Sequence, residues 1–361
     1  MGSVRFILAM AVVASHSSTL FGIELAGGRI SVQGFYIISG FLITLMLTEK
    51  YGTGVRDLWL FYSNRALRIW VPYAVVAVAT VLLLKLAPLL GGNTVGGAAV
   101  IGSWKALSKL DLVTAVAVLV ANLSLIGTDI GMLFAHRAGE GLVFTANFHL
   151  EARPFYEFYI LPQTWTLGLE LSFYAVAPFL VRRHPAVIVV MLGLSVATRL
   201  WAYGNGFTND PWNYRFFPFE LALFLTGALA AKAYGQIGRA AWSQTGWARA
   251  GALVGVLPLI LQPYARLPEP LMFALFAGAL PVLFLWTKGM AVDRRLGDLS
   301  YPLYLVHFTV LLVIQSLPQL DAPVAHSGHV VVPLSIAVAM LVAAKVEVPL
   351  DAFRRKRLSP T

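Results

Sequence analysis

Residues 69–90 of the chain read IWVPYAVVAVATVLLLKLAPLL, and Lys85 is the only charged side chain among them. An α-helix rises about 1.5 Å per residue, so this run is long enough to cross the roughly 30 Å hydrocarbon core of a bilayer. Other long apolar runs recur from Phe6 to the end of the chain. The sequence therefore predicts a polytopic integral membrane protein.

The composition of the chain agrees with this prediction. Of 361 residues, 58% are hydrophobic and only 12% are charged, whereas about a quarter of the residues of a soluble domain are charged. The net charge of +10 would suggest a nucleic-acid partner in a soluble protein, but most basic residues lie in short loops between apolar runs, which indicates membrane orientation instead. The chain has no cysteine, which excludes thiolate metal sites and an acyl-cysteine intermediate. We expect no nucleic-acid partner, no metal site and no bound cofactor.

The predicted fold class is an all-α bundle of about ten transmembrane helices. The first run has no small-residue cleavage site and is interpreted as a retained helix. The expected spans cover residues 4–22, 32–48, 69–90, 163–181, 185–203, 216–233, 250–265, 267–287, 300–318 and 330–349.

The positive-inside rule orients these spans with both termini in the cytoplasm. The expected cytoplasmic basic residues are Arg5, Lys50, Arg56, Arg65, Arg68, Arg182, Arg183, Lys232, Arg239, Arg249, Lys288, Arg294, Arg295, Arg354, Arg355, Lys356 and Arg357. They make up 17 of the 27 Lys and Arg residues.

One apolar run, residues 112–127, does not fit this scheme. If it crossed the membrane, every later loop would change sides and the basic tail would lie outside, against the positive-inside rule. We therefore interpret it as re-entrant, interfacial or packed beside the spans, which is possible where its backbone is buried in protein.

The longest expected extracytoplasmic segment, residues 91–162, has two interpretations. It could bind a sugar acceptor, or its aromatic residues could anchor it at the membrane interface. Its polar and aromatic candidates are His136, Arg137, Glu140, His149, Glu151, Arg153, Phe155, Tyr156, Phe158 and Tyr159.

Arg5 and His16 lie eleven positions apart in the first expected span. At about 100° per residue they are separated by about 20° more than three full turns, so both side chains share one stripe of the helix. The rise of about 16 Å places Arg5 near the cytoplasmic face and His16 toward the opposite face. The spacing leaves open whether this histidine is structural or catalytic, and whether the arginine only snorkels to the interface.

Three further groups of polar residues lie in or beside apolar spans. Arg65 and Arg68, at the cytoplasmic edge of the third span, could clamp a phosphate together, although topological anchoring is the simpler interpretation of this pair alone. Glu170 must be paired, protonated or exposed to a polar cavity, and with a neutral histidine it could form an acid/base pair. A third group shares one helical face, where hydrogen bonding between helices is expected: Ser300, Tyr304 and His307.

Taken in order, these segments resemble the acyltransferase 3 family of membrane-bound acyltransferases over nearly the whole chain. The family patterns are Arg-x10-His, an aromatic stretch with Ser-Gly-Phe, Arg-x-x-Arg, Trp-Ser/Thr-Leu-x-x-Glu-x-x-Phe-Tyr, and a late Ser-Tyr to Leu-x-His run. They match Arg5 and His16, Phe35 to Phe41, Arg65 and Arg68, Trp165 to Tyr174, and Ser300 to His307. Two departures occur: Asn64 stands where glycine often precedes the arginine pair, and Thr166 replaces the commoner serine.

The resemblance implies a single membrane domain over residues 1–361, without the soluble C-terminal domain of longer members. It implies transfer of an acyl group, such as acetyl, from cytoplasmic acyl-CoA to a hydroxyl of an extracytoplasmic or lipid-linked carbohydrate at the bacterial inner membrane. His16 would then be catalytic with Glu170, while Arg5, Arg65 and Arg68 would bind the donor. Supporting roles would fall to Tyr36, Ser39, Trp165, Tyr174, Ser300, Tyr304 and His307.

Two other classes of protein compete with this interpretation. A transporter or flippase would be favoured by two matching halves with broken spans, and the sequence contains no such repeat. A non-catalytic membrane scaffold would not need Arg5, His16 and Glu170 in apolar helices.

Overall fold

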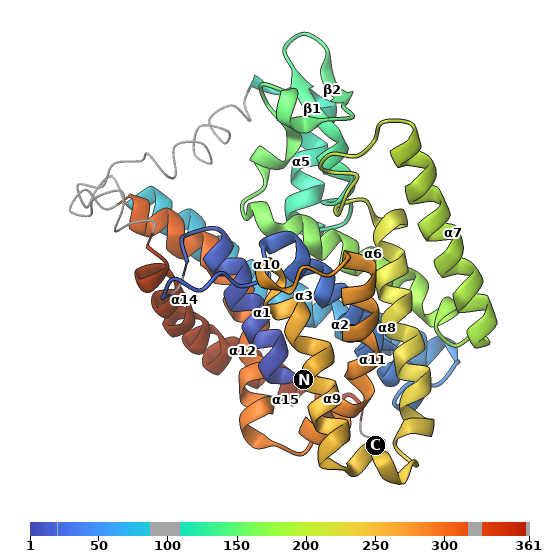
Figure 1. The fold of residues 1–361 in the computed structure, drawn as a ribbon. Coiled ribbons are helices and arrows are strands. Elements are labelled where there is room, and N and C mark those ends of the chain that lie inside the picture. Colours follow the sequence, from blue (N-terminus) through green and yellow to red (C-terminus); the bar gives the residue numbers. More distant parts are fainter. Residues whose placement is uncertain (20, 87–108, 317–326, 359–361) are drawn as a thin grey trace.

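The helices of the protein form one bundle with a small β-hairpin at one end (Figure 1). The computed structural model describes residues 1–19, 21–86, 109–316 and 327–358. Within these residues the only strands are β1 (Phe134–Arg137) and β2 (Gly141–Phe144), which pair antiparallel. The expected helical fold class is therefore confirmed.

The helices follow the expected spans in order. They are α1 (Gly2–Ser15), α2 (Gly28–Glu49), α3 (Val55–Leu86), α5 (Leu112–Ser124), α6 (Trp165–Leu180), α7 (Pro185–Gly204), α8 (Phe217–Ile237), α9 (Gly246–Ile260), α10 (Gln262–Ala265), α11 (Glu269–Thr287), α12 (Ala291–Gln315), α14 (Gly328–Val342) and α15 (Val348–Lys356). A π-helical stretch, Ala343–Glu347, joins the last two. Short 3-10 helices cover Ile130–Leu133, Phe148–Leu150, Phe155–Phe158, Pro162–Thr164 and Ala241–Gln244.

Six helices in the described part of the chain are long and apolar enough to cross a membrane. They are α2, α3, α7, α11, α12 and the continuous helix over residues 328–356. Ten spans are thus not confirmed, because α1, α6 and α9 have only 14, 16 and 15 residues, and α8 is not among the six. The outer ends of the expected spans 69–90 and 300–318 lie outside the described residues.

The first helix ends earlier than expected, at Ser15 instead of residue 22. The hydroxyl of Ser15 donates to the carbonyl of Val12 at 2.7 Å, and that of Ser17 donates to the carbonyl of Val13 at 3.1 Å. Serine hydroxyls that bond the last carbonyls in this way compete with continuation of the helix. His16 therefore caps α1 instead of lying within a longer span.

Helices α2 and α8 pack at the centre of the bundle through two glycines. A Cβ on Gly40 would lie 1.9 Å from the carbonyl oxygen of Phe224, and a Cβ on Gly227 would lie 1.9 Å from that of Ile37. The backbones can approach this closely only because neither position carries a side chain. The close contact of Gly40 with α8 therefore also sets the position of its neighbour Ser39 in the bundle interior.

The run at 112–127 forms α5, which does not reach across the bundle. Thirteen residues rise only about 20 Å, and a left-handed residue, Leu125, ends the helix. Its last turn rests on α3, where the Tyr73 hydroxyl donates to the carbonyl of Asn122 at 2.7 Å and Trp70 donates to that of Leu123. The structure therefore supports the interpretation of this run as a non-spanning helix packed beside the spans.

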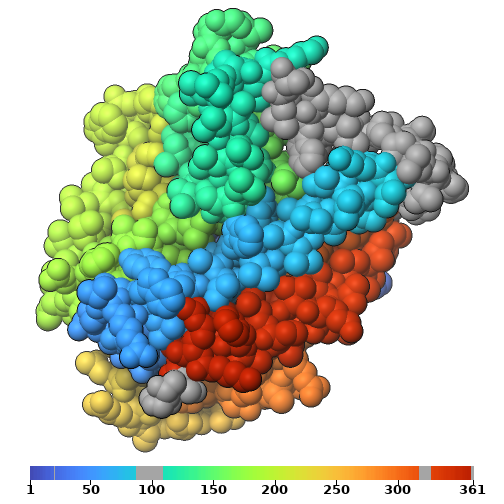
Figure 2. All heavy atoms as spheres, turned by 180° about the vertical axis from the view of Figure 1, so that it is seen from behind, coloured from blue at the N-terminus to red at the C-terminus, as the bar shows by residue number. Residues whose placement is uncertain are grey.

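The chain's two terminal helices lie against the helices that carry the arginine motifs. Arg357 of the C-terminal segment donates to the side chains of Asn64 and Ser63 at 2.8 Å each, and Figure 2 shows this segment lying along α3. At the start of the chain, the ammonium of Met1 pairs with Asp293 of α12 at 2.9 Å. The first contact holds the C-terminal segment on α3, the second holds α1 on α12, and α12 in turn packs on α3.

Candidate active site

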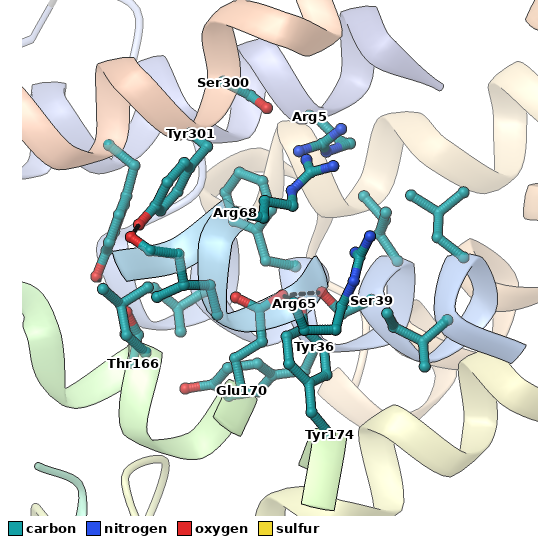
Figure 3. Close-up of a pocket in the computed structure, with 18 of the residues that line it drawn as sticks. Arg5, Tyr36, Ser39, Arg65, Arg68, Thr166, Glu170, Tyr174, Ser300 and Tyr301 are labelled. Carbon is teal, nitrogen blue, oxygen red and sulfur yellow. Dashed lines mark hydrogen bonds between the residues drawn. The ribbon is translucent and has the colours of Figure 1, made fainter. Parts of the chain in front are cut away.

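A cavity of about 140 Å³ lies where α1, α2, α3, α6 and α12 meet (Figure 3). We call it the arginine cavity. All five sequence motifs contribute to its wall, although they are spread over the whole chain. The motif residues that line it are Arg5, Phe35, Tyr36, Ile38, Ser39, Arg65, Arg68, Thr166, Leu167, Glu170, Tyr174, Ser300, Tyr301 and Tyr304.

The side chains of Arg5, Arg65 and Arg68 line this cavity and make no hydrogen bond or ion pair to any described residue. Arg65 is only 5% exposed, and its Nε is buried with no partner. Figure 3 shows Arg5 and Arg68 extending into the same space from opposite helices. Like charges held together away from water are costly unless an anion pairs with them, so the cavity is suited to an anionic group.

The arginine pair of α3 does not lie at the edge of its helix. Because α3 begins at Val55, Arg65 and Arg68 lie within the helix and face the bundle interior. The expected apolar span begins at residue 69 of the same helix, so the place of the pair at the cytoplasmic edge of the membrane stays a prediction. Burial of Arg65 also argues against simple anchoring at the membrane surface, since an anchoring side chain reaches water.

Glu170 is the one carboxylate that lines the arginine cavity. Its Oε1 accepts hydrogen bonds from Ser39 at 3.2 Å and from Tyr174, and Figure 3 shows the three side chains together. The neighbouring Tyr36 hydroxyl is buried without a partner in the described chain. Ser300 turns back to its own helix, donating to the carbonyl of Gly297 at 2.7 Å.

A second cavity, of about 200 Å³, lies beyond the end of α1, and we call it the histidine cavity. It is lined by Val12, His16, Gly28, Arg29, Val32, Met132, Phe148, His149, Tyr156, Pro162, Gln163, Trp165, Tyr214, Arg215, Tyr304 and Phe308. The end of α1, the 130–165 segment and the loop before α8 build it together. Gln163 contributes a buried Oε1 that has no partner among the described residues.

His16 faces this second cavity beside another imidazole. The rings of His16 and His307 stack with centroids 5.4 Å apart, and Phe308 contacts His16 at 4.7 Å. His307 is 1% exposed. Its Nδ1 meets the carbonyl of Tyr304, whereas its Nε2 is buried with no described partner. Because a carbonyl only accepts, Nδ1 carries the proton and Nε2 keeps a free lone pair.

His16 and Glu170 therefore open into different cavities. The hydrogen bonds of Glu170 go to Ser39 and Tyr174, and the ring contacts of His16 go to His307 and Phe308. The acid/base pair expected for His16 and Glu170 is not formed as a direct contact. Among the described residues, only Val32 and Tyr304 line both cavities.

Arg215, which none of the sequence motifs indicated, lines the histidine cavity. Its guanidinium lies 4.2 Å from the ring centre of Trp165 and 4.5 Å from that of Tyr214, and its Nε donates to Asp210 at 2.7 Å. Stacking and ion pairing of this kind hold an arginine rigidly. The signal in the sequence was an arginine flanked by aromatic residues at a loop end, five positions after an aspartate.

Within the described part of the expected acceptor segment, only some of the candidate residues line a cavity. His149 and Tyr156 line the histidine cavity, whereas His136 lies on the hairpin, 3.8 Å from Asp111. Most aromatic residues of this segment neither line a cavity nor anchor the segment at the membrane interface, because they are buried in its core. They are Phe155 (4% exposed), Phe158 (2%) and Tyr159 (1%).

Comparison with known proteins was informative at the level of the family. The family profile of acyltransferase 3, described as an acyltransferase domain, matches residues 2–344. No curated protein and no solved structure matches the chain.

Proposed function

The chain belongs to the acyltransferase 3 family, and on that premise we propose that it transfers an acetyl or similar acyl group from acyl-CoA to a hydroxyl of an extracytoplasmic or lipid-linked carbohydrate. It would do so in the bacterial inner membrane with both termini in the cytoplasm. One observation carries the proposal. Three arginines without partners in the described chain line one cavity, and an imidazole pair lies at the next cavity along the bundle.

The arginine cavity would hold the anionic end of the donor. CoA carries phosphates, and arginine forms strong charge-assisted hydrogen bonds to phosphate oxygens. Arg5, Arg65 and Arg68 have their donors free for this purpose. Glu170 lies among them, held by Ser39 and Tyr174, and would limit the mutual repulsion of the three cations.

His16 would carry out the chemistry from the histidine cavity. As a general base it would take the proton of the acceptor hydroxyl while that oxygen attacks the thioester carbonyl carbon. The C–S bond then breaks, and the CoA sulfur leaves as a thiol after taking the proton from the imidazolium. Alternatively, His16 would attack the thioester itself and pass the acyl group on to the acceptor hydroxyl. In either route, the walls contributed by Trp165, Tyr156 and Arg215 would contact the acceptor.

The transporter or flippase alternative has no support from the family match or from the cavities. Family membership indicates transfer chemistry, and the sequence contains no repeated halves.

Purified protein in lipid nanodiscs, supplied with acetyl-CoA and a membrane glycolipid fraction, tests the proposal. Release of the CoA thiol can be followed with a thiol reagent, because the protein has no cysteine of its own. Turnover that disappears in His16→Ala supports the proposal. An intact protein that neither binds nor consumes any acyl-CoA contradicts it.

A further inference from the structure

The two cavities share a partition built from two side chains on separate helices. Val32 of α2 and Tyr304 of α12 line both cavities. Both are buried, at 5% and 8% exposed. The shortest route of an acyl group from the arginine cavity to His16 would therefore run past these two side chains.

Tyr304 is held in place by partners on both sides of the partition. Its hydroxyl donates to the carbonyl of Gln163 at 2.9 Å and shares a hydrogen bond with Thr166 at 2.7 Å. Thr166 lines the arginine cavity, and Gln163 lines the histidine cavity. Gln163 is itself fixed to α12, because its amide donates to the carbonyl of Leu305 at 2.9 Å.

The two hydrogen bonds of the Tyr304 hydroxyl make the Tyr304 side of the partition rigid. A swing of the Tyr304 ring would break both hydrogen bonds of a buried hydroxyl, which is unfavourable without replacement partners. The ring also contacts His307, with centroids 5.6 Å apart, so the space behind it is filled. Val32 is a short, stiff side chain with one strongly preferred rotamer in a helix.

We propose that the Val32–Tyr304 partition determines which acyl groups the protein transfers, by admitting short acyl chains and rejecting longer ones. This inference rests on the proposed function, because it concerns the donor of that same reaction. Size selection follows from the packing of a rigid wall, against which one added methylene can change a rate by roughly 10-fold or more.

The test compares acetyl-, butyryl- and hexanoyl-CoA by release of the CoA thiol from protein in nanodiscs. The parent protein should consume acetyl-CoA fastest. Val32→Ala removes one face of the partition and should raise the ratio of the hexanoyl to the acetyl rate by roughly tenfold or more. Val32→Phe narrows the passage and should abolish turnover of butyryl- and hexanoyl-CoA before that of acetyl-CoA. Tyr304→Phe keeps the ring but removes its hydrogen bonds to Thr166 and Gln163. It should also broaden the range of acyl chains that the protein transfers.

Two matched controls separate the partition from the rest of the donor site. Ile43 lies on the same helix as Val32 but lines only the arginine cavity. Tyr301 lines only that cavity too, and its hydroxyl donates to the carbonyl of Ile69 at 2.9 Å. Ile43→Ala and Tyr301→Phe should leave the hexanoyl-to-acetyl ratio unchanged, whatever they do to the absolute rates.

The outcomes distinguish this inference from the proposed function. If the parent protein consumes acetyl-CoA and all three partition variants keep its chain-length ratio, the partition does not select and the inference is wrong, while the proposed function stands. If the parent consumes no acyl-CoA, the proposed function fails first. Should Val32→Ala not fold, as judged by thermal unfolding and gel filtration, Val32→Phe and Tyr304→Phe decide the question by the same ratio.

Discussion

The imidazoles of His16 and His307 lie face to face, with ring centroids 5.4 Å apart, although nearly the whole chain separates them. The Tyr304 carbonyl fixes the proton of His307 on Nδ1, so the buried Nε2 presents a lone pair beside His16.

His16→Gln tests whether this imidazole is chemical or structural. Glutamine keeps a hydrogen-bonding side chain of similar reach but cannot take up a proton near neutral pH. Transfer should fall by about 10²–10⁴-fold, while acyl-CoA binding and the thermal midpoint stay near those of the parent. Turnover close to the parent rate would exclude His16 as base or nucleophile and direct attention to Glu170 or His149.

Arg65→Ala and Arg68→Ala should weaken acyl-CoA binding by about 1.5–3 kcal/mol each, which is the usual contribution of a hydrogen bond to a charged group. Neither arginine side chain makes a hydrogen bond or direct ion pair to a described residue, so Arg65→Ala should change the thermal midpoint of the donor-free protein little. Arg68→Ala also removes the attraction of Arg68 for the buried Glu347, and should lower that midpoint slightly. Arg182 is the matched control, because it donates to the carbonyls of Leu47, Tyr51 and Gly52 at 2.7–2.9 Å.

Arg182→Ala should lower the thermal midpoint and leave acyl-CoA affinity unchanged. Isothermal titration with CoA and a thermal shift assay measure both quantities. Equal acyl-CoA affinity in the parent, Arg65→Ala and Arg68→Ala would mean that Arg65 and Arg68 do not bind the donor and serve only as topological anchors.

Gly40→Ala should destabilise the bundle strongly. The new Cβ would lie 1.9 Å from the carbonyl oxygen of Phe224, so α2 and α8 must separate, at a cost of about 1–3 kcal/mol or more. Gly193 of α7 has open space around its added Cβ, and Gly193→Ala should be neutral or slightly stabilising because alanine is the better helix former. Equal unfolding midpoints for the two variants would show that the close approach of α2 and α8 is not needed.

Asp129, in the segment between α5 and α6, should make stability depend on pH. Burial raises the pKa of this carboxyl from 3.8 to about 6. The folded protein therefore holds its proton in a range where the unfolded chain has lost it, so stability falls as pH rises from about 4 to about 6 and stays lower above that. Asp129→Asn should remove up to about 3 kcal/mol of this loss.

Unfolding by denaturant at pH 4 and at pH 8 measures the Asp129 effect. The stability gap between the two conditions should be smaller in the variant than in the parent. An unchanged gap would mean that Asp129 ionises in the folded protein as it does in the unfolded chain.

Reporter fusions at the two termini test the orientation. The basic residues expected in the cytoplasm predict that both termini lie there. A C-terminal reporter active only outside the cytoplasm would overturn this orientation.

Several features could be predicted from the sequence because they depend on neighbours along the chain. Apolar runs indicated helices, and charge placement identified α5 as a run that does not cross the bundle. Motif spacing identified the family, and several of the predicted site residues do line the arginine cavity: Arg5, Tyr36, Ser39, Arg65, Arg68, Glu170, Tyr174, Ser300 and Tyr304.

The sequence could not predict which faces meet, because contacts between helices depend on packing of the whole bundle. Tertiary structure alone decided that Glu170 bonds to Ser39 and Tyr174 and not to His16, and that Arg215 lines the second cavity. The end of α1 at Ser15 is instead a local feature, because the hydroxyls of Ser15 and Ser17 bond to carbonyls of its own last turn. The division into two cavities at Val32 and Tyr304 again depends on tertiary structure, since those side chains come from helices far apart in sequence and become one wall only when α2 and α12 pack around α6.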